Sequence, residues 1–216
     1  MPLSPKVIVV ANGKGGVGKT TTVMALTGIL SENYRVLAVD ADSQGSFSWW
    51  AKRGKKNMGF DLVQETDPEL LSRLRKTEGY EIVVVDTPPA LNSEALAAVI
   101  AIADYLILPT PPAPMDLAVL VETVRTAIAP LGKAHRVLLT RVDSRSQREA
   151  LDALNTLTEL GIPAFHTFIR AYKAHERAAL EGVPISQWRG ENAHEAKADY
   201  CRIADELQRD WESEDG

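Results

Sequence analysis

The sequence predicts an α/β fold with a predominantly parallel sheet and helices on both faces of it. Short apolar, often β-branched runs alternate along the chain with longer segments of helical periodicity. Continuous apolar runs are typical of strands buried on both faces, and the alternation is typical of parallel strands joined by crossover helices. A glycine-rich segment follows the first run, in the order strand, loop and helix.

The first strand and helix have the clearest patterns. Residues 7–11 form a β-branched run that stops at a glycine-rich turn, which predicts a buried strand. Residues 20–30 place Val23, Leu26, Ile29 and Leu30 at helical spacing, which predicts the helix that follows.

Further apolar runs predict strands at residues 36–39, 82–85, 105–109 and 136–140, with another edge strand at 165–169. Intervening helical patterns predict helices at residues 68–76, 93–103, 117–129, 147–159, 173–181 and 193–211.

Size and composition predict one folded domain over residues 1–216, with a frayed tail at about 212–216. The apolar fraction of 45% and the charged fraction of 25% are typical of soluble globular proteins. The single cysteine, Cys201, excludes an intramolecular disulfide and a cysteine-built metal site. A cytoplasmic protein without a membrane partner is expected, and a net charge of −5 means that any nucleic-acid contact needs a local basic patch.

The glycine-rich segment matches the pattern G-x-x-x-x-G-K-[ST] of a P-loop NTPase. Its backbone amides and the following helix N-terminus would hold the phosphates of ATP, Lys19 would contact the β and γ phosphates, and Thr20 would coordinate Mg²⁺. A turn without a ligand is the alternative, but the strand and helix on either side favour the motif. The predicted nucleotide-binding residues are Gly13, Lys14, Gly15, Gly16, Val17, Gly18, Lys19, Thr20 and Thr21.

Lys14 is a second lysine near the start of this loop, and alone it could be a solvated surface charge. The segment from Lys14 to Thr20 resembles the deviant Walker A loop of the ParA/MinD family of ATPases. The resemblance implies that Lys14 reaches the phosphates of a partner subunit in an ATP-sandwich homodimer. Lys14 would then stabilise charge in trans, much as an arginine finger does.

Three carboxylates follow predicted strands, where α/β sheets place ligand-binding groups. The segment Asp40-Ala41-Asp42-Ser43-Gln44-Gly45 is similar to a switch segment of the family, with Ser43 where proline is usual. The resemblance implies that Asp42 orients the attacking water, that Asp40 supports Mg²⁺, and that Asp86 binds Mg²⁺. Capping of a turn is the alternative role for these residues. Lys14, Lys19 and Asp42 are thus the expected catalytic residues, in water attack on the γ-phosphate.

The resemblance narrows to short ParA-type members, which include plasmid-partition and McdA-like proteins. The acidic C-terminus does not fit the membrane-binding helix of MinD-like members, and a single cysteine does not fit the iron–sulfur carriers of the superfamily. The bacterial tyrosine kinases of the superfamily carry a C-terminal tyrosine cluster, and this sequence has none. An early first strand leaves no room for a helix-turn-helix extension. The implied function is slow, partner-stimulated ATP hydrolysis that positions a plasmid, a chromosome origin or a protein body on nucleoid DNA, with a small ParB-like or adaptor protein as the partner.

Candidate contacts to nonspecific DNA are Arg170, Lys173 and Arg177, with Arg189 and Lys197 as weaker candidates. A solvated helix face balanced by Glu176 and Glu181 is the alternative. Pro184 lies where the family borders adenine. The pair Trp49-Trp50 could stack on bases or on a partner, but helix packing beside the switch segment is the favoured interpretation.

Two other functions are compatible with the motif. The chain could be a regulatory switch that binds a protein partner without DNA, or a metabolic P-loop enzyme such as a dethiobiotin synthetase. ATP-dependent, salt-sensitive DNA binding would separate the first from a positioning ATPase. Lys14 and the switch segment disfavour the second.

Overall fold

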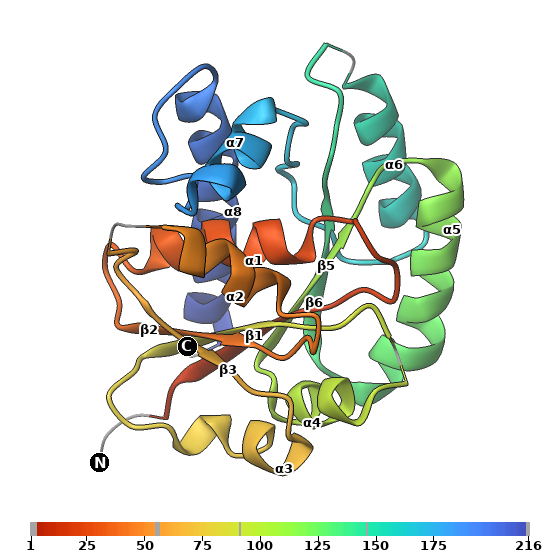
Figure 1. Cartoon of the computed structure of the whole chain (residues 1–216). Coiled ribbons are helices and arrows are strands. Elements are labelled where there is room, and N and C mark those ends of the chain that lie inside the picture. The colour runs from red at the N-terminus through yellow and green to blue at the C-terminus, as the bar shows by residue number, and fades with distance from the viewer. Residues whose placement is uncertain (1–3, 55–56, 91, 146, 215–216) are drawn as a thin grey trace.

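The fold is a six-stranded parallel sheet covered by helices on both faces, as a computed structural model of the chain shows (Figure 1). Residues 4–54, 57–90, 92–145 and 147–214 are described, without the side chains of residues 212–214. The strand order is β3-β2-β4-β1-β5-β6, and every strand pair is parallel. The predicted fold class is therefore confirmed.

The strands and helices alternate along most of the chain. The strands are β1 (Lys6–Val10), β2 (Val36–Asp40), β3 (Asp61–Gln64), β4 (Ile82–Asp86), β5 (Tyr105–Thr110) and β6 (Ala134–Leu139). The helices are α1 (Lys19–Leu30), α2 (Ser46–Arg53), α3 (Pro68–Leu71), α4 (Glu94–Ile102), α5 (Pro114–Thr123), α6 (Arg148–Glu159), α7 (Lys173–Glu181) and α8 (Ala193–Glu214).

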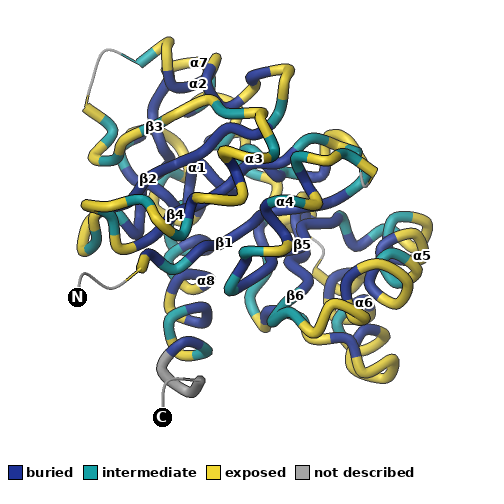
Figure 2. Tube along the Cα trace, turned by 90° about the horizontal axis from the view of Figure 1, so that it is seen from below, coloured by how far each residue is buried: buried dark blue, intermediate teal, exposed yellow. Residues whose placement is uncertain are grey.

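Alternation of side chains along the central strands builds two hydrophobic cores, one on each face of the sheet. Ile8 and Val10 of β1 belong to the core under α1, α2, α7 and α8. Val7 and Val9 belong to the core under α3, α4, α5 and α6. The strands β1, β2, β4 and β5 are accordingly the most deeply buried part of the trace, whereas the edge strand β3 is mostly exposed and α5 and α6 expose their outer sides (Figure 2).

Two elements had no residue range predicted from the sequence, although helix packing was favoured for Trp49-Trp50 within the first of them. Helix α2 follows the switch segment directly, and its apolar side chains cluster within a short stretch. Strand β3 carries only two apolar residues, Leu62 and Val63, and lies at the edge of the sheet, where burial demands less apolar surface.

Three expected elements differ from the structure. Residues 165–169 do not form a strand: only isolated bridges join Ala164 and Arg170 to the β6 side. The expected helix 68–76 is α3 followed by a separate 3-10 turn, and the expected helix 117–129 is α5 followed by π-helical and 3-10 turns. Pro130 lacks an amide donor, so regular α-helical bonding cannot continue through it.

At the C-terminus, α8 continues to Glu214 and so includes residues 212–214, which were expected to fray. Residues 215 and 216 lie outside the described part of the chain. No helix among the described residues is both long and apolar enough to cross a membrane.

Candidate nucleotide-binding site

The glycine-rich loop connects β1 to α1 at the carboxyl edge of the sheet. Gly16 and Gly18 have φ values of 73° and 99°, a backbone region in which side chains with a Cβ are strained. Gly18 is also the N-cap of α1, and its carbonyl accepts the first helical bond from Thr22 N. The loop therefore curls back onto the N-terminus of a helix, a geometry suited to binding anions.

Lys19 is buried in this loop and binds the loop's own backbone. Its Nζ donates to the carbonyl oxygens of Asn12 and Lys14, both at 3.0 Å. Burial lowers the pKa of Lys19, while the nearby charges of Asp86 and Asp42 act in the opposite direction. Phosphate oxygens would give this desolvated ammonium a stronger acceptor than the two carbonyls it now contacts.

Asp86 ends β4 and is paired in register with Asp40 at the end of β2. Its Oδ2 accepts a hydrogen bond of 2.7 Å from Thr20 Oγ1, whereas its buried Oδ1 has no partner among the described residues. The pKa of Asp86 is raised to about 7, chiefly by burial and also by the charges of Asp40 and Asp42, while the hydrogen bond from Thr20 and the charge of Lys19 act in the opposite direction. An unpartnered buried carboxylate oxygen of this kind is stabilised by a cation.

These residues fit a Mg²⁺ ion that is also bound by nucleotide. Thr20, Asp40 and Asp86 offer the hard oxygen donors that Mg²⁺ prefers, and the ion normally keeps phosphate or water oxygens as its other ligands. Among the described residues, no group of three or more His, Cys, Asp or Glu side chains could hold a metal ion by itself. Dependence on nucleotide phosphates is consistent with that finding.

Asp40 links this edge of the sheet to α2. Its Oδ2 accepts from Ser48 N at 2.8 Å, and its Oδ1 accepts from Asp42 N at 3.3 Å. Asp42 is partly exposed, and its Oδ1 accepts from Gln44 N, so the segment between β2 and α2 is a tight turn with a carboxylate at its surface. Asp40 and Asp42 both lie close enough to Asp86 to affect its pKa, and Asp42 also affects the pKa of Lys19.

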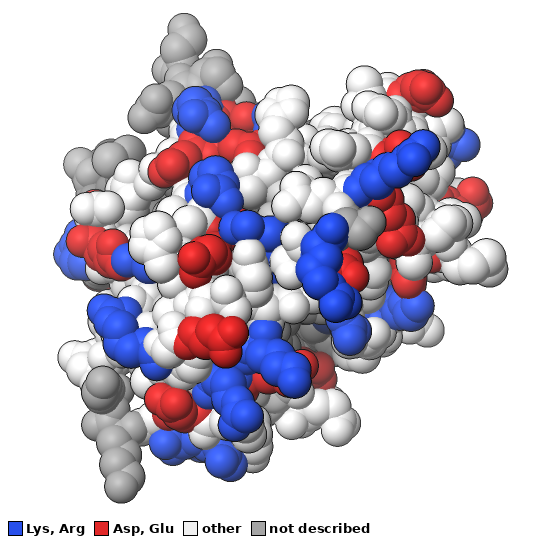
Figure 3. Space-filling view, turned by 90° about the horizontal axis from the view of Figure 1, so that it is seen from above, with Lys and Arg blue, Asp and Glu red and all other residues white. Residues whose placement is uncertain are grey.

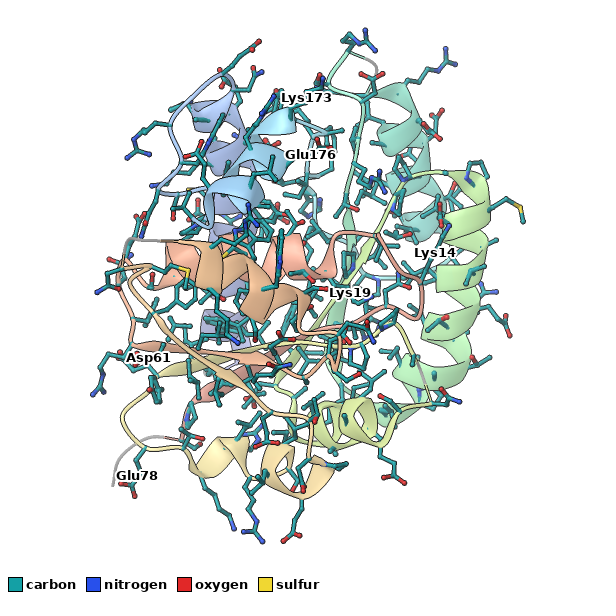
Figure 4. The ribbon with its side chains drawn as sticks, viewed as in Figure 1. Lys14, Lys19, Asp61, Glu78, Lys173 and Glu176 are labelled. Atoms are coloured by element: carbon teal, nitrogen blue, oxygen red, sulfur yellow. The ribbon has the colours of Figure 1, made fainter. Side chains whose placement is uncertain are left out.

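The side chain of Lys14 extends away from that of Lys19 although both residues belong to one loop (Figure 4). Its side chain is 55% exposed and forms an ion pair with Asp116 in the first turn of α5. No candidate role had been assigned to Asp116 from sequence.

Other residues that support the loop were also missed in the sequence. Asn12 Nδ2 donates to Pro109 O, which ties the loop to the end of β5. Thr140 Oγ1 donates to Val17 O at 2.7 Å, and Arg141 Nη1 donates to Gly16 O at 3.0 Å. Their position at the end of a predicted strand or directly after one was the available signal, since residues at this edge of a parallel sheet face the ligand.

A cavity of about 270 Å³ opens beside the loop. Residues from the P-loop, α1, the end of β6, α7 and α8 line it: Gly16, Gly18, Thr21, Thr140, Arg141, Ile169, Arg170, Ala171, Tyr172, Lys173, His175, Glu176 and Tyr200. Burial lowers the pKa of His175, whose ring packs edge-on against Tyr200. The cavity is a place where a base could lie next to bound phosphates.

Two of the predicted site residues have surroundings that differ from those expected. Pro184 is not part of this cavity: it packs on Gly28, where an added Cβ would lie 2.6 Å from that of the proline. The guanidinium of Arg170 is held by the buried Asp199, with Nη2 to Oδ1 at 2.7 Å, and stacks on Tyr172. This internal ion pair, with the side chain of Arg170 only 21% exposed, argues against Arg170 as a DNA contact.

The remaining basic candidates differ in their surroundings. Lys173 and Arg177 are exposed one turn apart on α7. Lys197 pairs with Glu32, and Arg189 donates to the carbonyls of Ser186 and Trp188. Lys and Arg groups on the face seen from above are separated by acidic side chains rather than joined in one patch (Figure 3).

The neighbouring tryptophans have different environments. Trp50 is buried, and its Nε1 donates to Val183 O. Trp49 is 54% exposed, with the Arg53 guanidinium 4.7 Å from its ring centroid. The expected helix packing therefore holds for Trp50 and not for Trp49.

Comparison with known proteins gives consistent matches. Residues 8–185 match the family described as CobQ/CobB/MinD/ParA nucleotide binding domain. A maintenance of carboxysome distribution protein A from Gloeobacter kilaueensis is 67% identical over 207 residues, which cover 96% of each chain.

Two similar solved structures support the same fold. An ATP complex of the D38A variant of Cyanothece McdA has a TM-score of 0.76 at 19% identity, covering 95% of this chain and 97% of that one. The septum site-determining protein MinD of Pyrococcus horikoshii with Mg-ADP has a TM-score of 0.77 at 22% identity, covering 94% and 96%.

Proposed function

Because the chain belongs to the CobQ/CobB/MinD/ParA family of nucleotide-binding domains, we propose that it is an ATPase that positions a cargo by binding DNA as an ATP-dependent dimer. The observation that carries the proposal is the joint placement of two loop lysines and three strand-end carboxylates at one edge of the sheet. Lys19, Thr20 and Asp86 are coupled directly, whereas Lys14 extends away from them at the surface.

The proposed chemistry is in-line attack of water on the γ-phosphate of ATP. Asp42, partly exposed in its turn, orients the water, and Lys19 stabilises negative charge on the phosphates. Lys14 supplies a second positive charge to the phosphates of a partner subunit. Mg²⁺, held by Thr20, Asp86 and the nearby Asp40, would neutralise charge on the phosphates. Catalysis then depends on positioning and electrostatics, without a covalent intermediate.

The cavity beside the loop is the proposed base site. Thr21 and Tyr172 line it from two sides, and Arg141 connects it to Gly16 of the loop. This assignment replaces Pro184 as the adenine contact.

The cargo we propose is a protein body of the carboxysome kind. Support comes from the name of the Gloeobacter kilaueensis relative, which matches this chain over nearly its full length. A cell that builds carboxysomes and lacks its own distribution ATPase should regain evenly spaced carboxysomes when it expresses this chain. Clustered carboxysomes despite stable expression would contradict this cargo.

The biochemical test compares the wild type with Lys14→Ala and Asp42→Ala. We expect Asp42→Ala to form dimers with ATP and to remain on DNA without turnover, and Lys14→Ala to lose hydrolysis while retaining ADP binding. Hydrolysis is measured by phosphate release, assembly by light scattering after gel filtration, and DNA binding by fluorescence anisotropy. Unchanged turnover in both variants, with no DNA binding by any of the proteins, would refute the proposed function.

A further inference from the structure

Lys14 has a partner within its own chain, and that partner lies outside the P-loop. The ion pair joins Lys14 Nζ to Asp116 Oδ1 of α5, residues that are 102 positions apart in sequence. The Asp116 side chain is only 13% exposed, whereas that of Lys14 is 55% exposed. The carboxylate is therefore largely enclosed by its surroundings, whereas the lysine side chain has open solvent around it.

The backbone positions both members. Lys14 N donates to Asn12 Oδ1 at 2.8 Å, and Lys14 O accepts from Lys19 Nζ, so the main chain of Lys14 is held while its side chain extends outward. Asp116 lies in the first turn of α5, where the helix dipole favours a carboxylate. The first turn of α5 thus places the Asp116 carboxylate beside the side chain of Lys14.

Exposed apolar side chains lie beside the ion pair on α5. Met115 and Val119, on either side of Asp116 in α5, are 78% and 57% exposed. Together they leave apolar surface beside the pair that a docked protein would bury. A second copy of the chain, approaching to receive Lys14, would meet them.

We propose that Asp116 is a positioning residue that holds Lys14 in the free chain and must release it when a second copy of the chain docks against α5. This inference rests on the proposed function, because it assumes that Lys14 acts on a partner's nucleotide. Lys14 cannot bind Asp116 and the partner's nucleotide at the same time. The free energy of the internal ion pair is therefore lost when the dimer forms, which weakens the dimer. Removing the carboxylate therefore favours the dimer.

The size of the effect follows from the exposure of the pair. A partly exposed ion pair changes an equilibrium by about 1.4-fold to about five-fold. Since each protomer releases one pair, Asp116→Asn should lower the dimer dissociation constant with ATP by about two-fold to about 25-fold. Basal hydrolysis at subsaturating protein concentration should rise accordingly.

The test measures the dimer dissociation constant by sedimentation velocity, with ATP in an Asp42→Ala background to prevent turnover. Asp116→Asn should tighten the dimer, and Asp116→Glu should restore the behaviour of the parent because it keeps the charge. Glu122→Gln is the matched control, since it removes one carboxylate from an exposed position in the same helix and leaves the Lys14 pair intact. With ADP, every variant should remain monomeric.

A double-variant cycle shows whether Asp116 acts through Lys14. Asp116→Asn should have no effect on dimerisation when Lys14 is already alanine. The inference would be overturned if Asp116→Asn tightened the dimer equally in the Lys14→Ala background, or if Glu122→Gln tightened it as much as Asp116→Asn does. It would also be overturned if Asp116→Asn left the dimer unchanged or weakened it. If the parent forms no ATP-dependent dimer at all, it is the proposed function that fails; if the parent dimerises and Asp116→Asn does not differ from it, only the role of Asp116 fails.

Discussion

At the scale of single residues, Asp86 makes the stability of the nucleotide-free protein depend on pH. Its pKa is about 7 in the folded chain and close to 3.8 when unfolded. Between these values the folded state binds more protons, so stability falls as pH rises. In EDTA without nucleotide, we expect the free energy of unfolding to fall by about 2 kcal/mol from pH 5 to pH 7 because of Asp86.

Asp86→Asn is the control for this dependence, because an amide of the same shape does not titrate. Guanidinium unfolding at both pH values should show the loss in the wild type and a smaller loss in the variant, where other groups alone contribute. Two parallel pH profiles would show that Asp86 is ionised in the folded protein throughout this range.

Thr140 tests whether the end of β6 supports the phosphate-binding loop. Thr140→Val removes the donor to the carbonyl of Val17, a residue that is only 1% exposed. Leaving a buried carbonyl without its donor costs about 1–3 kcal/mol. Urea unfolding should show this loss, and calorimetry should show weaker ADP binding, whereas Thr140→Ser should retain most of both. If the serine variant loses as much as the valine variant, packing of the methyl group matters more than the hydrogen bond.

The sequence alone predicts the role of a residue when the residues it acts with are close to it in sequence. Lys19 and Thr20 could be assigned because the motif fixes their distance from the glycines, and the structure places them beside Asp86 as expected. Thr140 and Asp116 could not, because each reaches the loop from more than 100 positions away in sequence. The surroundings of Pro184 were not predictable for the same reason: its neighbour, Gly28, is set by the packing of distant segments.

At the scale of elements, the close approach of α2 and α7 depends on Gly54 at the end of α2 and Gly182 at the end of α7. Gly182 ends α7 with a φ of 69°, and an added Cβ would lie 2.1 Å from the backbone nitrogen of Gly54. Gly161, after α6, has a similar φ of 67° with nothing near the position of its Cβ. A side chain at Gly182 or at Gly161 would meet the same backbone strain, but only at Gly182 would it also clash with a neighbouring backbone.

We therefore expect Gly161→Ala to lower the free energy of unfolding by about 1–2 kcal/mol, the cost of left-handed backbone strain. Gly182→Ala should lose more, about 3 kcal/mol or above, because α2 and α7 must also separate. Chemical denaturation of both variants measures the difference. Equal losses would mean that the two helices can move apart at little cost.

Whether an element could be predicted depended on how much of it is buried. Strands β1, β2, β4 and β5 are central or nearly so, and their continuous apolar runs located them to within a residue or two. The segment 165–169 also has buried apolar residues, yet it is not a strand. Its amides at His166 and Thr167 bind the Glu206 carboxylate of α8 instead of a neighbouring strand. A hydrogen bond across 39 or 40 positions has no local sequence signal.

At the scale of the whole molecule, the nucleotide site and the exposed basic residues of α7 are connected. Lys173 lines the cavity beside the loop (Figure 4). Arg177 lies one turn further along α7. Arg53 Nε donates to Leu180 O, so α7 is also bonded to α2, the helix that begins after the Asp42 turn. The cavity beside the P-loop and helix α2 therefore both border α7, the helix that carries the strongest remaining DNA candidates.

These contacts lead to a prediction about salt-dependent DNA binding. If Lys173 and Arg177 contact phosphates, replacing both by alanine should reduce the slope of log affinity against log salt by about two for each chain on the duplex. The measurement is anisotropy of a labelled duplex with ATP, repeated at several salt concentrations in the Asp42→Ala background. The matched control is Arg73→Ala with Lys76→Ala, which removes the same charge from the α3 region at the opposite end of the molecule (Figure 1). A slope that falls equally in both pairs would mean that total charge governs binding, and a slope that changes in neither would place the DNA surface away from α7.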